Sequence, residues 1–306
     1  MVVGAVIVTY SPDIEELHTL IKKIQLSVKS IIIVDNLSEN IASIRHLIKS
    51  INNNTFIIEL DKNKGIGFAQ NRGIELLFKD ENIEAIILFD HDSNPNVDMV
   101  DVLSRQYNSL TNDGVKVGAV GPVYIDNRTN NHYPISVYSN FNLTKKYPVH
   151  GDNIPIYTSF LIASGCLIHK STLLKVGTMD EDFFIDYIDI EWSFRAQHYG
   201  FSLYACPDAI MYHKVGDDRL NFWGREISIH SPLRRYYLAR NSVLMLGKKY
   251  IDWKYKVREI FYTFSRVVVY LAIVNQKKKY LKYILHGWYD GIIGKVGVSK
   301  FSQKNI

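Results

Sequence analysis

Short apolar runs alternate with segments of helical spacing from the N-terminus to about residue 123, and this alternation constrains the possible fold most strongly. The runs are rich in β-branched residues and predict strands at 2–8, 30–34, 55–60, 85–89 and 117–123. The segments between them predict helices at 13–24, 41–51, 67–78 and about 97–110. Such alternation is typical of an α/β fold with a mostly parallel central sheet and crossover helices on both faces.

The second half of the chain is less regular. Residues 124–157 lose periodicity and are rich in Asn, Tyr and Pro, so we expect a long excursion on the substrate side. A return to the sheet, a helix and a further strand are predicted, in that order, at 158–169, 189–198 and 203–213. Beyond about residue 231 the pattern is helical and aromatic, and residues 299–306 are expected to fray.

These patterns predict two parts of unequal size. Residues 1–235 are expected to form one α/β domain, with a first half at about 1–123 and a second half at about 124–235. Residues 236–306 are expected to form a helical, aromatic and basic extension.

The composition is that of an ordinary globular protein, with 47% hydrophobic and 22% charged residues in 306. The two cysteines, Cys166 and Cys206, lack metal-type spacing and cannot build a disulfide framework, which favours reduced thiols in a cytoplasmic protein. Residues 1–8 lack a basic flank and a cleavage site, so they predict a strand and not a signal peptide. No run of about 18 uncharged apolar residues predicts a transmembrane helix.

The net charge of +5 arises from a basic excess late in the chain. Between Lys248 and Lys282, lysine and arginine are interleaved with Tyr, Trp and Phe. This mixture suits an anionic membrane surface, and we expect a peripheral location at the inner face of the cell membrane. A solvated basic helix face is the alternative interpretation. Nothing in the chain indicates a nucleic-acid partner.

Asp90, His91, Asp92 and Ser93 directly follow the predicted strand at 85–89. In open α/β sheets the ligand crevice lies at the carboxyl ends of the strands. Two carboxylates at such a position make an oxygen-rich site that suits Mg²⁺ or Mn²⁺, with substrate phosphates completing the coordination. The sequence therefore predicts a divalent ion held against a diphosphate, although such aspartates also commonly cap turns.

Polar residues follow the other strands too. Thr9 and Tyr10 end the first strand and suit the wall of a site for a nucleotide base or ribose. Asp35 ends the second strand, where its carboxylate could accept a hydrogen bond from a pyrimidine N3–H; an Asx turn is the alternative.

The segment 63–73 opens the third predicted helix, and its glycines and helix N-terminus favour an anion. Its candidate ligand-binding residues are Asn63, Gly67, Asn71 and Arg72. Gln70 stands where a dinucleotide fingerprint has its third glycine, so a nicotinamide-dependent dehydrogenase is disfavoured.

A second acidic segment, 180–192, mixes carboxylates with apolar neighbours. Such surroundings raise the proton affinity of a carboxylate and suit a general base, for which Asp189 and Glu191 are the candidates. An ion pair between Asp189 and Arg195 is the structural alternative.

Further candidates lie at the end of the strand at 203–213 and beyond it. His213 could complete a divalent-ion site with Asp92, although a lone histidine at a strand end is more often structural. Cations for a diphosphate or a lipid-linked phosphate are Lys214, Arg234, Arg235 and Arg240.

Together these motifs occur in the order found in family two glycosyltransferases, which the chain resembles over roughly residues 3–245. The matching segments are 6–10, 32–36, 63–73, 90–93, 164–166, 183–195 and 212–213. The run 184–192 and the Asp-x-Asp-Ser form look like the rhamnosyltransferase branch, although His91 stands where that branch often has Gln.

The resemblance implies a GT-A fold, a nucleotide-sugar donor, a divalent ion (Mg or Mn) and inversion at the anomeric carbon. By position, Asp35 would contact the base, Asp90 the ribose or the metal, and Asp92 the ion together with His213. The donor half would be residues 1–123 or thereabouts, and the acceptor half about 124–235. The residues assigned to donor binding are Thr9, Tyr10, Asp35, Asn63, Gly67, Asn71, Arg72, Asp90, His91, Arg234 and Arg240. Asp189 occupies the position of the family's base. Many members have Glu-Asp there, whereas Ile188 precedes Asp189 here, which leaves Asp189 and Glu191 as alternatives.

The resulting hypothesis is an inverting, metal-dependent transfer of L-rhamnose from dTDP-β-L-rhamnose. The expected acceptor is a saccharide on a polyprenyl diphosphate, in the synthesis of a bacterial surface polysaccharide such as O-antigen or capsule. One alternative keeps the fold but uses a UDP-hexose or galactofuranose donor. Another is a catalytically silent nucleotide-binding scaffold subunit.

Overall fold

The computed structural model describes residues 1–51, 54–127, 129–148, 153–213, 219–222, 225–228 and 230–302, with the backbone alone described at 213, 219–222 and 225–228. Strands and helices alternate through its first half, as predicted. The strands are β1 (Val3–Thr9), β2 (Ser30–Asp35), β3 (Thr55–Glu59), β4 (Ala85–Asp90), β5 (Asn94–Pro95) and β6 (Val117–Asp126). The helices are α1 (Ile14–Ile24), α2 (Ile41–Ser50), α3 (Ile66–Leu77) and α4 (Met99–Asn112).

The second half contains shorter strands and most of the helices. Its strands are β7 (Ile135–Ser139), β8 (Asn142–Lys146), β9 (Ile156–Thr158), β10 (Leu167–His169), β11 (Ser202–His213), β12 (Arg219–Phe222) and β13 (Arg225–Ser228). Its helices are α5 (Lys170–Val176), the 3₁₀ turn η1 (Glu181–Phe183), α6 (Ile188–His198), α7 (Pro232–Gly247), α8 (Trp253–Ile273) and α9 (Lys277–Ile292).

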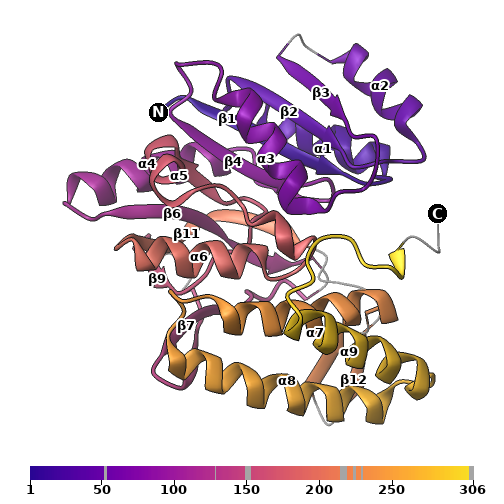
Figure 1. The fold of residues 1–306 in the computed structure, drawn as a ribbon. Helices are drawn as coiled ribbons and strands as arrows, with labels where there is room; N and C mark the ends of the chain where they lie inside the picture. Colours follow the sequence, from indigo (N-terminus) through magenta and orange to yellow (C-terminus); the bar gives the residue numbers. More distant parts are fainter. Residues whose placement is uncertain are drawn as a thin grey trace.

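The main sheet is mostly parallel and has the order β3-β2-β1-β4-β10-β6-β11-β5, with β9 paired to β11 (Figure 1). β1 pairs in parallel with both β2 and β4, and β11 runs parallel to β6. The exceptions are β10, which is antiparallel to β4 and β6, and the edge strands β5 and β9. The predicted α/β fold is therefore confirmed.

Helices cover both faces of this sheet. On one face α1, α2 and α4 pack against alternate strand residues such as Ile7 and Ile33. On the other face α3, α5 and α6 pack against the intervening residues, such as Val6 and Ile32. Because β1 is buried along its whole length, its sequence is a continuous apolar run.

Two predictions for the second half need correction. The excursion at 124–157 contains regular structure, because β6 extends to Asp126 and β7 pairs with β8 as an antiparallel hairpin. The predicted strand at 158–169 is a strand only at β10 and at Thr158, the last residue of β9. The intervening residues leave the sheet, and several of them line the cavity described below.

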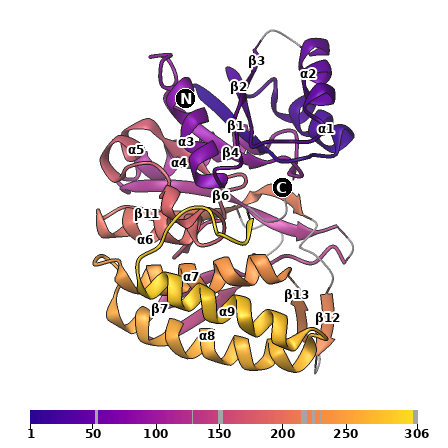
Figure 2. The ribbon, with the colours of Figure 1, turned by 45° about the vertical axis from the view of Figure 1, so that its right-hand side comes forward.

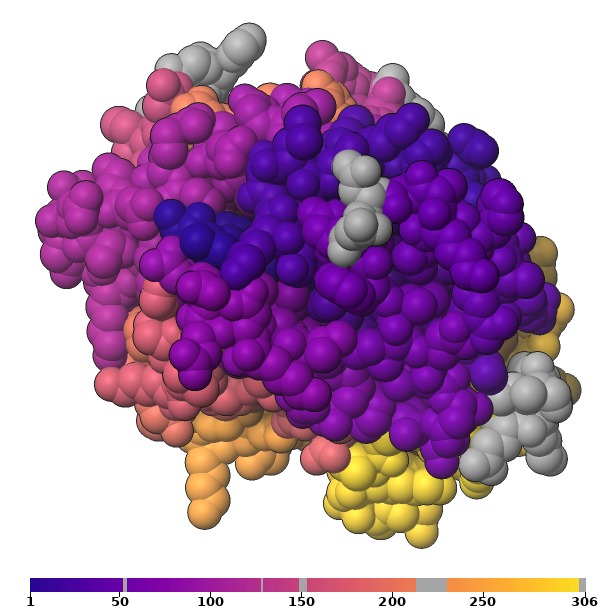
Figure 3. Space-filling model, turned by 90° about the horizontal axis from the view of Figure 1, so that it is seen from above, coloured from indigo at the N-terminus to yellow at the C-terminus, as the bar shows by residue number. Residues whose placement is uncertain are grey.

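The C-terminal helices α7, α8 and α9 form a layer below the sheet domain, on the side away from β1, β2 and β3 (Figures 1 and 2). Viewed from the opposite side, residues of the first half cover most of the surface, and the C-terminal residues show only near its rim (Figure 3). α7 spans the predicted boundary at residue 235. Among the helices that the structure describes, none is long and apolar enough to cross a membrane.

Candidate active site

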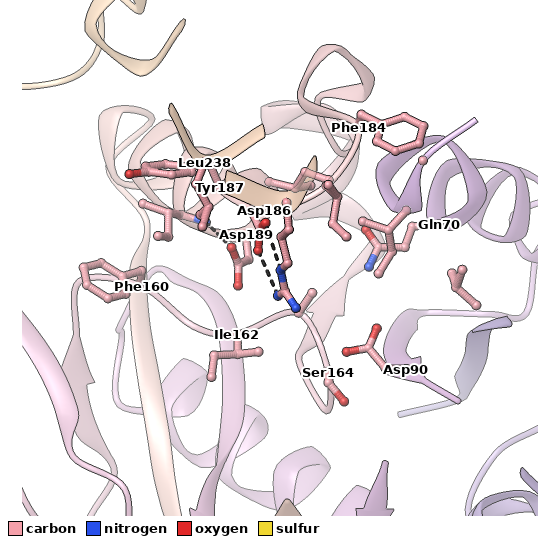
Figure 4. Close-up of a pocket in the computed structure, with 18 of the residues that line it drawn as sticks. Gln70, Asp90, Phe160, Ile162, Ser164, Phe184, Asp186, Tyr187, Asp189 and Leu238 are labelled. Atoms are coloured by element: carbon pink, nitrogen blue, oxygen red, sulfur yellow. Dashed lines mark hydrogen bonds and ion pairs between the residues drawn. The ribbon is translucent and has the colours of Figure 1, made fainter. Parts of the chain in front are cut away.

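A cavity of about 980 Å³ opens at the carboxyl ends of β1 and β4. Its walls come from segments that are far apart in the sequence: the ends of these strands, residues 160–164, residues 184–190, and helices α7 and α8. Figure 4 shows Asp90, Asp186 and Asp189 around one open space, with Tyr187 and Phe160 on the far side of Asp189 from Asp90 in this view. The strand-end crevice predicted from the sequence is thus present.

Asp90 and Asp92 both line this cavity, and a serine holds the turn between them. The Asp90 N–H donates to Ser93 Oγ over 3.1 Å, and Ser93 Oγ lies 2.5 Å from Ser164 Oγ. Because Ser93 caps the turn, the aspartate side chains are not needed for it. Among the described residues, none donates a hydrogen bond to either carboxylate.

The electrostatics at this point fit a cation. Burial raises the pKa of Asp90 to about 7, and the negative charges of Asp92 and Asp189 add to the effect, while Arg234 opposes it. A divalent ion would relieve this repulsion, and two carboxylates with substrate phosphates make a suitable oxygen donor set. In the part of the chain that the structure describes, no three His, Cys, Asp or Glu side chains form a metal-binding group by themselves. The side chain of His213 lies outside the described residues.

Asp189 lines the same cavity from the start of α6. Its Oδ1 accepts the Ile190 N–H over 2.9 Å. Burial raises the pKa of Asp189 to about 6, with a further contribution from Asp186, while backbone N–H groups oppose the rise. A carboxylate with this pKa is ionised at neutral pH and still basic enough to accept a proton, as a general base requires.

Glu191, the other candidate base, does not line the cavity. It is fully buried, its carboxylate pairs with Arg195 at 2.8 and 2.9 Å, and it accepts a hydrogen bond from the Tyr250 hydroxyl. The ion pair considered for Asp189 and Arg195 is therefore made by Glu191 instead. Of the two candidates, Asp189 alone faces the cavity.

The loop that precedes α6 has an unusual backbone. Phe184, Asp186 and Tyr187 adopt φ values of 64°, 62° and 68°, which non-glycine residues seldom do. Asn241 of α7 holds the loop, because its Nδ2 donates to the carbonyls of Phe183 (2.9 Å), Ile185 (2.7 Å) and Asp186 (3.1 Å). Sequence reasoning missed Asn241, since no local pattern relates it to a loop more than fifty residues away.

Arg234 and Arg240, both assigned to donor binding, have different surroundings. Arg234 lines the cavity and makes a bidentate pair with Asp186, at 3.2 and 3.0 Å. Arg240 is fully buried and does not line the cavity. It donates to the carbonyls of Gly297 (2.5 Å) and Phe183 (2.8 Å), so it ties α7 to the loop before α6 and to the C-terminal segment.

On the donor side, Tyr10, Asn63 and His91 line the cavity, as does Asn36. The Asn36 side chain bridges the second and third strand ends, donating to Asn63 Oδ1 over 3.0 Å and accepting from the Lys64 N–H over 2.9 Å. Asn36 therefore joins the predicted residues in this wall.

Thr9 and Asp35 are buried beneath that wall. The Asp35 carboxylate accepts hydrogen bonds from Thr9 Oγ1 (2.8 Å), from the Ser38 N–H (2.9 Å) and from the Ser38 hydroxyl. This local arrangement corresponds to the turn considered as the alternative for Asp35. One lone-pair position on Asp35 Oδ2 remains to accept a further hydrogen bond.

Gly67, Asn71 and Arg72 do not line the cavity. Asn71 clamps Met179, accepting from its N–H and donating to its carbonyl, each over 2.9 Å. Arg72 pairs with Glu75 at 2.6 Å and with Glu181 at 3.6 Å, and a Cβ on Gly67 would lie 3.3 Å from the Asp180 carbonyl oxygen. These residues support the acidic segment from behind.

The N-terminus of α3, predicted to favour an anion, is closed by the protein itself. The Ile66 N–H donates to the Phe184 carbonyl over 2.8 Å. Gly65 has φ 91°, and a Cβ there would lie 2.4 Å from the same carbonyl oxygen, so only glycine permits this approach.

Helix α8 supplies a wall that the sequence analysis did not assign to the site. Its cavity-lining residues are Tyr255, Arg258, Glu259, Tyr262 and Arg266. The Glu259 carboxylate accepts a hydrogen bond from the Tyr187 hydroxyl, which connects this wall to the loop before α6. The spacing of these residues at three and four along one helix is the signal in the sequence that could have identified them.

Comparison with known proteins agrees with this geometry. The model of the family "Glycosyl transferase family 2" matches residues 5–177. The dTDP-rhamnosyl transferase RfbF of Shigella flexneri is 33% identical over 303 residues, covering 97% of this chain and 98% of RfbF.

Solved structures share the fold at low identity. GalNAc-T7 with UDP, GalNAc and Mn²⁺ aligns with a TM-score of 0.58 and 15% identity, over 95% of this chain and 57% of its own. Residues 1–349 of Staphylococcus aureus TarS in complex with UDP-GlcNAc align with a TM-score of 0.58 and 13% identity, over 96% of this chain and 82% of TarS. The predicted GT-A fold is confirmed by these neighbours.

Proposed function

Because the chain belongs to glycosyl transferase family 2, we propose that it is an inverting rhamnosyltransferase that uses dTDP-β-L-rhamnose. The observation that carries this proposal is the near full-length similarity to a relative named as a dTDP-rhamnosyl transferase. The cavity supports it, because Asp90, Asp92 and Asp189 line one space large enough for a nucleotide sugar and an acceptor. Family membership makes the chain a glycosyltransferase, which disfavours the scaffold alternative.

In the proposed reaction, Asp189 removes the proton from an acceptor hydroxyl. The resulting oxygen attacks the anomeric carbon from the face opposite the leaving group, and the bond from that carbon to the diphosphate oxygen breaks with inversion. Held by Asp90 and Asp92, with His213 as the predicted further ligand, a divalent ion (Mg or Mn) would supply positive charge to the departing diphosphate. Arg234 lies close enough to lower the pKa of Asp90 and is the proposed protein cation for the same charge.

The donor's nucleoside is proposed to bind along the wall formed by Tyr10, Asn36 and Asn63. Asp35 is the proposed acceptor for the N3–H of the base, through the position left on Oδ2, and Thr9 orients its carboxylate. His91 lines the cavity beside the two metal-binding candidates and is proposed to contact the sugar or the diphosphate.

We propose in addition that the protein docks on an anionic membrane through α8 and α9. Exposed apolar side chains recur at helical spacing on both helices: Trp253, Ile260, Phe261, Phe264, Val268, Leu281, Leu285, Tyr289 and Ile292. The ring centroids of Phe264 in α8 and Trp288 in α9 are 5.1 Å apart, so the exposed apolar residues of the two helices form one surface. Lys277, Lys278, Lys279 and Lys282 beside it are exposed. Apolar residues flanked by lysines are typical of helices that bind anionic bilayers.

The alternative function is transfer from a donor other than dTDP-rhamnose. One observation favours it, since TarS, which shares the fold, was solved in complex with UDP-GlcNAc. Calorimetric titration with dTDP, UDP, GDP and NAD, with and without Mg²⁺ or Mn²⁺, separates the possibilities. We expect metal-dependent dTDP binding that Asp92→Asn loses, and no NAD binding. Preference for UDP or GDP would exclude the dTDP-sugar donor, and absence of nucleotide binding to folded protein would contradict the whole proposal.

A further inference from the structure

Helix α8 has two opposite faces with different chemistry. Arg258, Tyr262 and Arg266, spaced by four residues, lie on the face that lines the cavity. The apolar residues Phe264 and Val268 lie on the opposite, outer face and are 58% and 69% exposed. α8 therefore stands between the cavity and an apolar surface.

The two arginines of the inner face pack against the same aromatic ring. Each guanidinium carbon lies 5.1 Å from the ring centre of Tyr262, so the same ring supports both. Neither forms an ion pair or a hydrogen bond with any residue in the described part of the chain. Arg234, in the same cavity, is held by Asp186 instead.

The acidic groups near these arginines have other hydrogen-bonding partners. Asp186 and Glu259 contribute favourable charge at Arg266, but the Glu259 carboxylate accepts from the Tyr187 and Thr263 hydroxyls, and Asp186 pairs with Arg234. Two guanidinium groups thus face the cavity with hydrogen-bonding capacity unused by the described residues.

These arginines are separate from the carboxylates assigned to the donor. The charges that most affect the pKa of Asp90, apart from burial, are those of Asp92, Asp189 and Arg234. The groups that act on Arg266 are Tyr187, Tyr262, Glu259 and Asp186. Figure 4 places Tyr187 on the far side of Asp189 from Asp90, and Glu259 of α8 accepts a hydrogen bond from the Tyr187 hydroxyl. The α8 wall therefore lies on the side of Asp189 that faces away from Asp90.

We propose that Arg258 and Arg266 bind a phosphoryl group of the acceptor, namely the diphosphate of a lipid-linked saccharide. Guanidinium groups bind phosphate oxygens in bidentate geometry, and two of them suit the charge of a diphosphate. The apolar outer face of the same helix places a lipid surface within reach of the chain attached to that diphosphate. The inference rests on the proposed glycosyl transfer and adds the residues that would bind the diphosphate of the acceptor.

Binding of geranyl diphosphate to protein already saturated with dTDP tests this subsite. We expect calorimetry to show binding that is at least about tenfold weaker in Arg258→Gln, Arg266→Gln and the double variant, since each removes a charge-assisted contact. Arg258→Lys and Arg266→Lys keep the charge and should retain more affinity. Arg105→Gln, at an exposed arginine of α4 that does not line the cavity, should bind as the unchanged protein does.

Displacement of geranyl diphosphate by dTDP would overturn the proposal, and so would undiminished binding by the folded double variant. Inorganic pyrophosphate serves as the comparison for the source of the anion. Weaker binding of pyrophosphate supports a lipid-linked ligand, whereas equal binding argues against one. If dTDP itself does not bind the unchanged protein, the donor assignment fails, and the arginine variants still decide the subsite with geranyl diphosphate alone.

Discussion

Asp189 is the residue on which the proposed chemistry depends most, because it is the candidate base that faces the cavity. We expect Asp189→Asn to lower kcat by about 10² to 10⁴, the usual contribution of base catalysis, while the affinity for dTDP is retained. Steady-state kinetics and calorimetry on the same preparation measure the two effects. Near-normal turnover by the variant would exclude Asp189 as the base.

Glu191→Gln is the matched control for this experiment. Removing the Glu191 carboxylate leaves the Arg195 guanidinium without its buried partner. We therefore expect the free energy of unfolding to fall by about 3 kcal/mol or more, with little change in the turnover of the folded fraction. Urea denaturation distinguishes this structural role from a chemical one.

The pKa of Asp189 predicts how activity depends on pH. Because burial raises that pKa to about 6, kcat/KM should rise with pH through about 6, as the base loses its proton.

The raised pKa of Asp189 also means that the folded protein holds this proton more tightly than the unfolded chain does. Ionised Asp189 therefore lowers stability at neutral pH, and Asp189→Asn should unfold at a higher urea concentration at pH 7. An activity profile without an inflection near pH 6, or a variant less stable than the parent, would contradict the assignment.

At the scale of single residues, the sequence indicated which side chains are polar or charged better than it indicated which of them line the cavity. Asp90, Asp92 and Asp189 could be identified because each stands at the end of a strand or the start of a helix near the sheet's carboxyl edge. Arg240 and Asn71 have the same polar character, yet they bind backbone carbonyls in the interior. A local pattern cannot separate these cases, because the partners lie 57 and 108 residues away.

At the scale of elements, the close approach of α7 and α9 is specific enough to test. A Cβ on Gly287 of α9 would lie 2.4 Å from the Tyr236 carbonyl oxygen and 3.0 Å from the Ala239 Cβ. Gly287→Ala should therefore push the helices apart and lower the free energy of unfolding by about 1–3 kcal/mol. Gly247→Ala at the end of α7, where a Cβ meets no atom of the described residues within 4 Å, is the control and should be neutral or slightly stabilising. Equal stability of the two variants in urea would show that the helices are not tightly packed.

Elements with strong local patterns were predictable, and those defined by distant pairing were not. β1, β2 and β4 are buried, mostly apolar runs, and their boundaries agree with the prediction to within a residue or two. β10 is three residues long and is a strand because β4 and β6 flank it. α8 is a recognisable helix from its spacing, but only the folded chain shows that one face of it completes the cavity.

At the scale of the whole molecule, the exposed apolar surface of α8 and α9 predicts membrane docking. We expect Phe261→Glu with Val268→Glu, at side chains that are 72% and 69% exposed, to abolish sedimentation with phosphatidylglycerol vesicles. Leu174→Glu, at a 73% exposed leucine of α5, is the matched control and should sediment normally. Weak binding of the parent protein to phosphatidylcholine vesicles would confirm the contribution of the lysines. Unchanged sedimentation of the double variant would refute docking through this surface. Point variants are preferable to deleting residues 250–306, since α8 forms part of the cavity wall.

The central claim is that the protein transfers rhamnose to its acceptor in the cavity described here. The mass of the product tests this claim most directly. Polyprenyl-diphosphate-linked saccharides would be incubated with equal amounts of dTDP-β-L-rhamnose and UDP-GlcNAc, a divalent ion and either the parent protein or Asp189→Asn. We predict that the parent adds a deoxyhexose, that the new linkage has the inverted anomeric configuration by NMR, and that the variant adds almost nothing. Addition of N-acetylhexosamine, or retention of configuration, would contradict the proposed reaction.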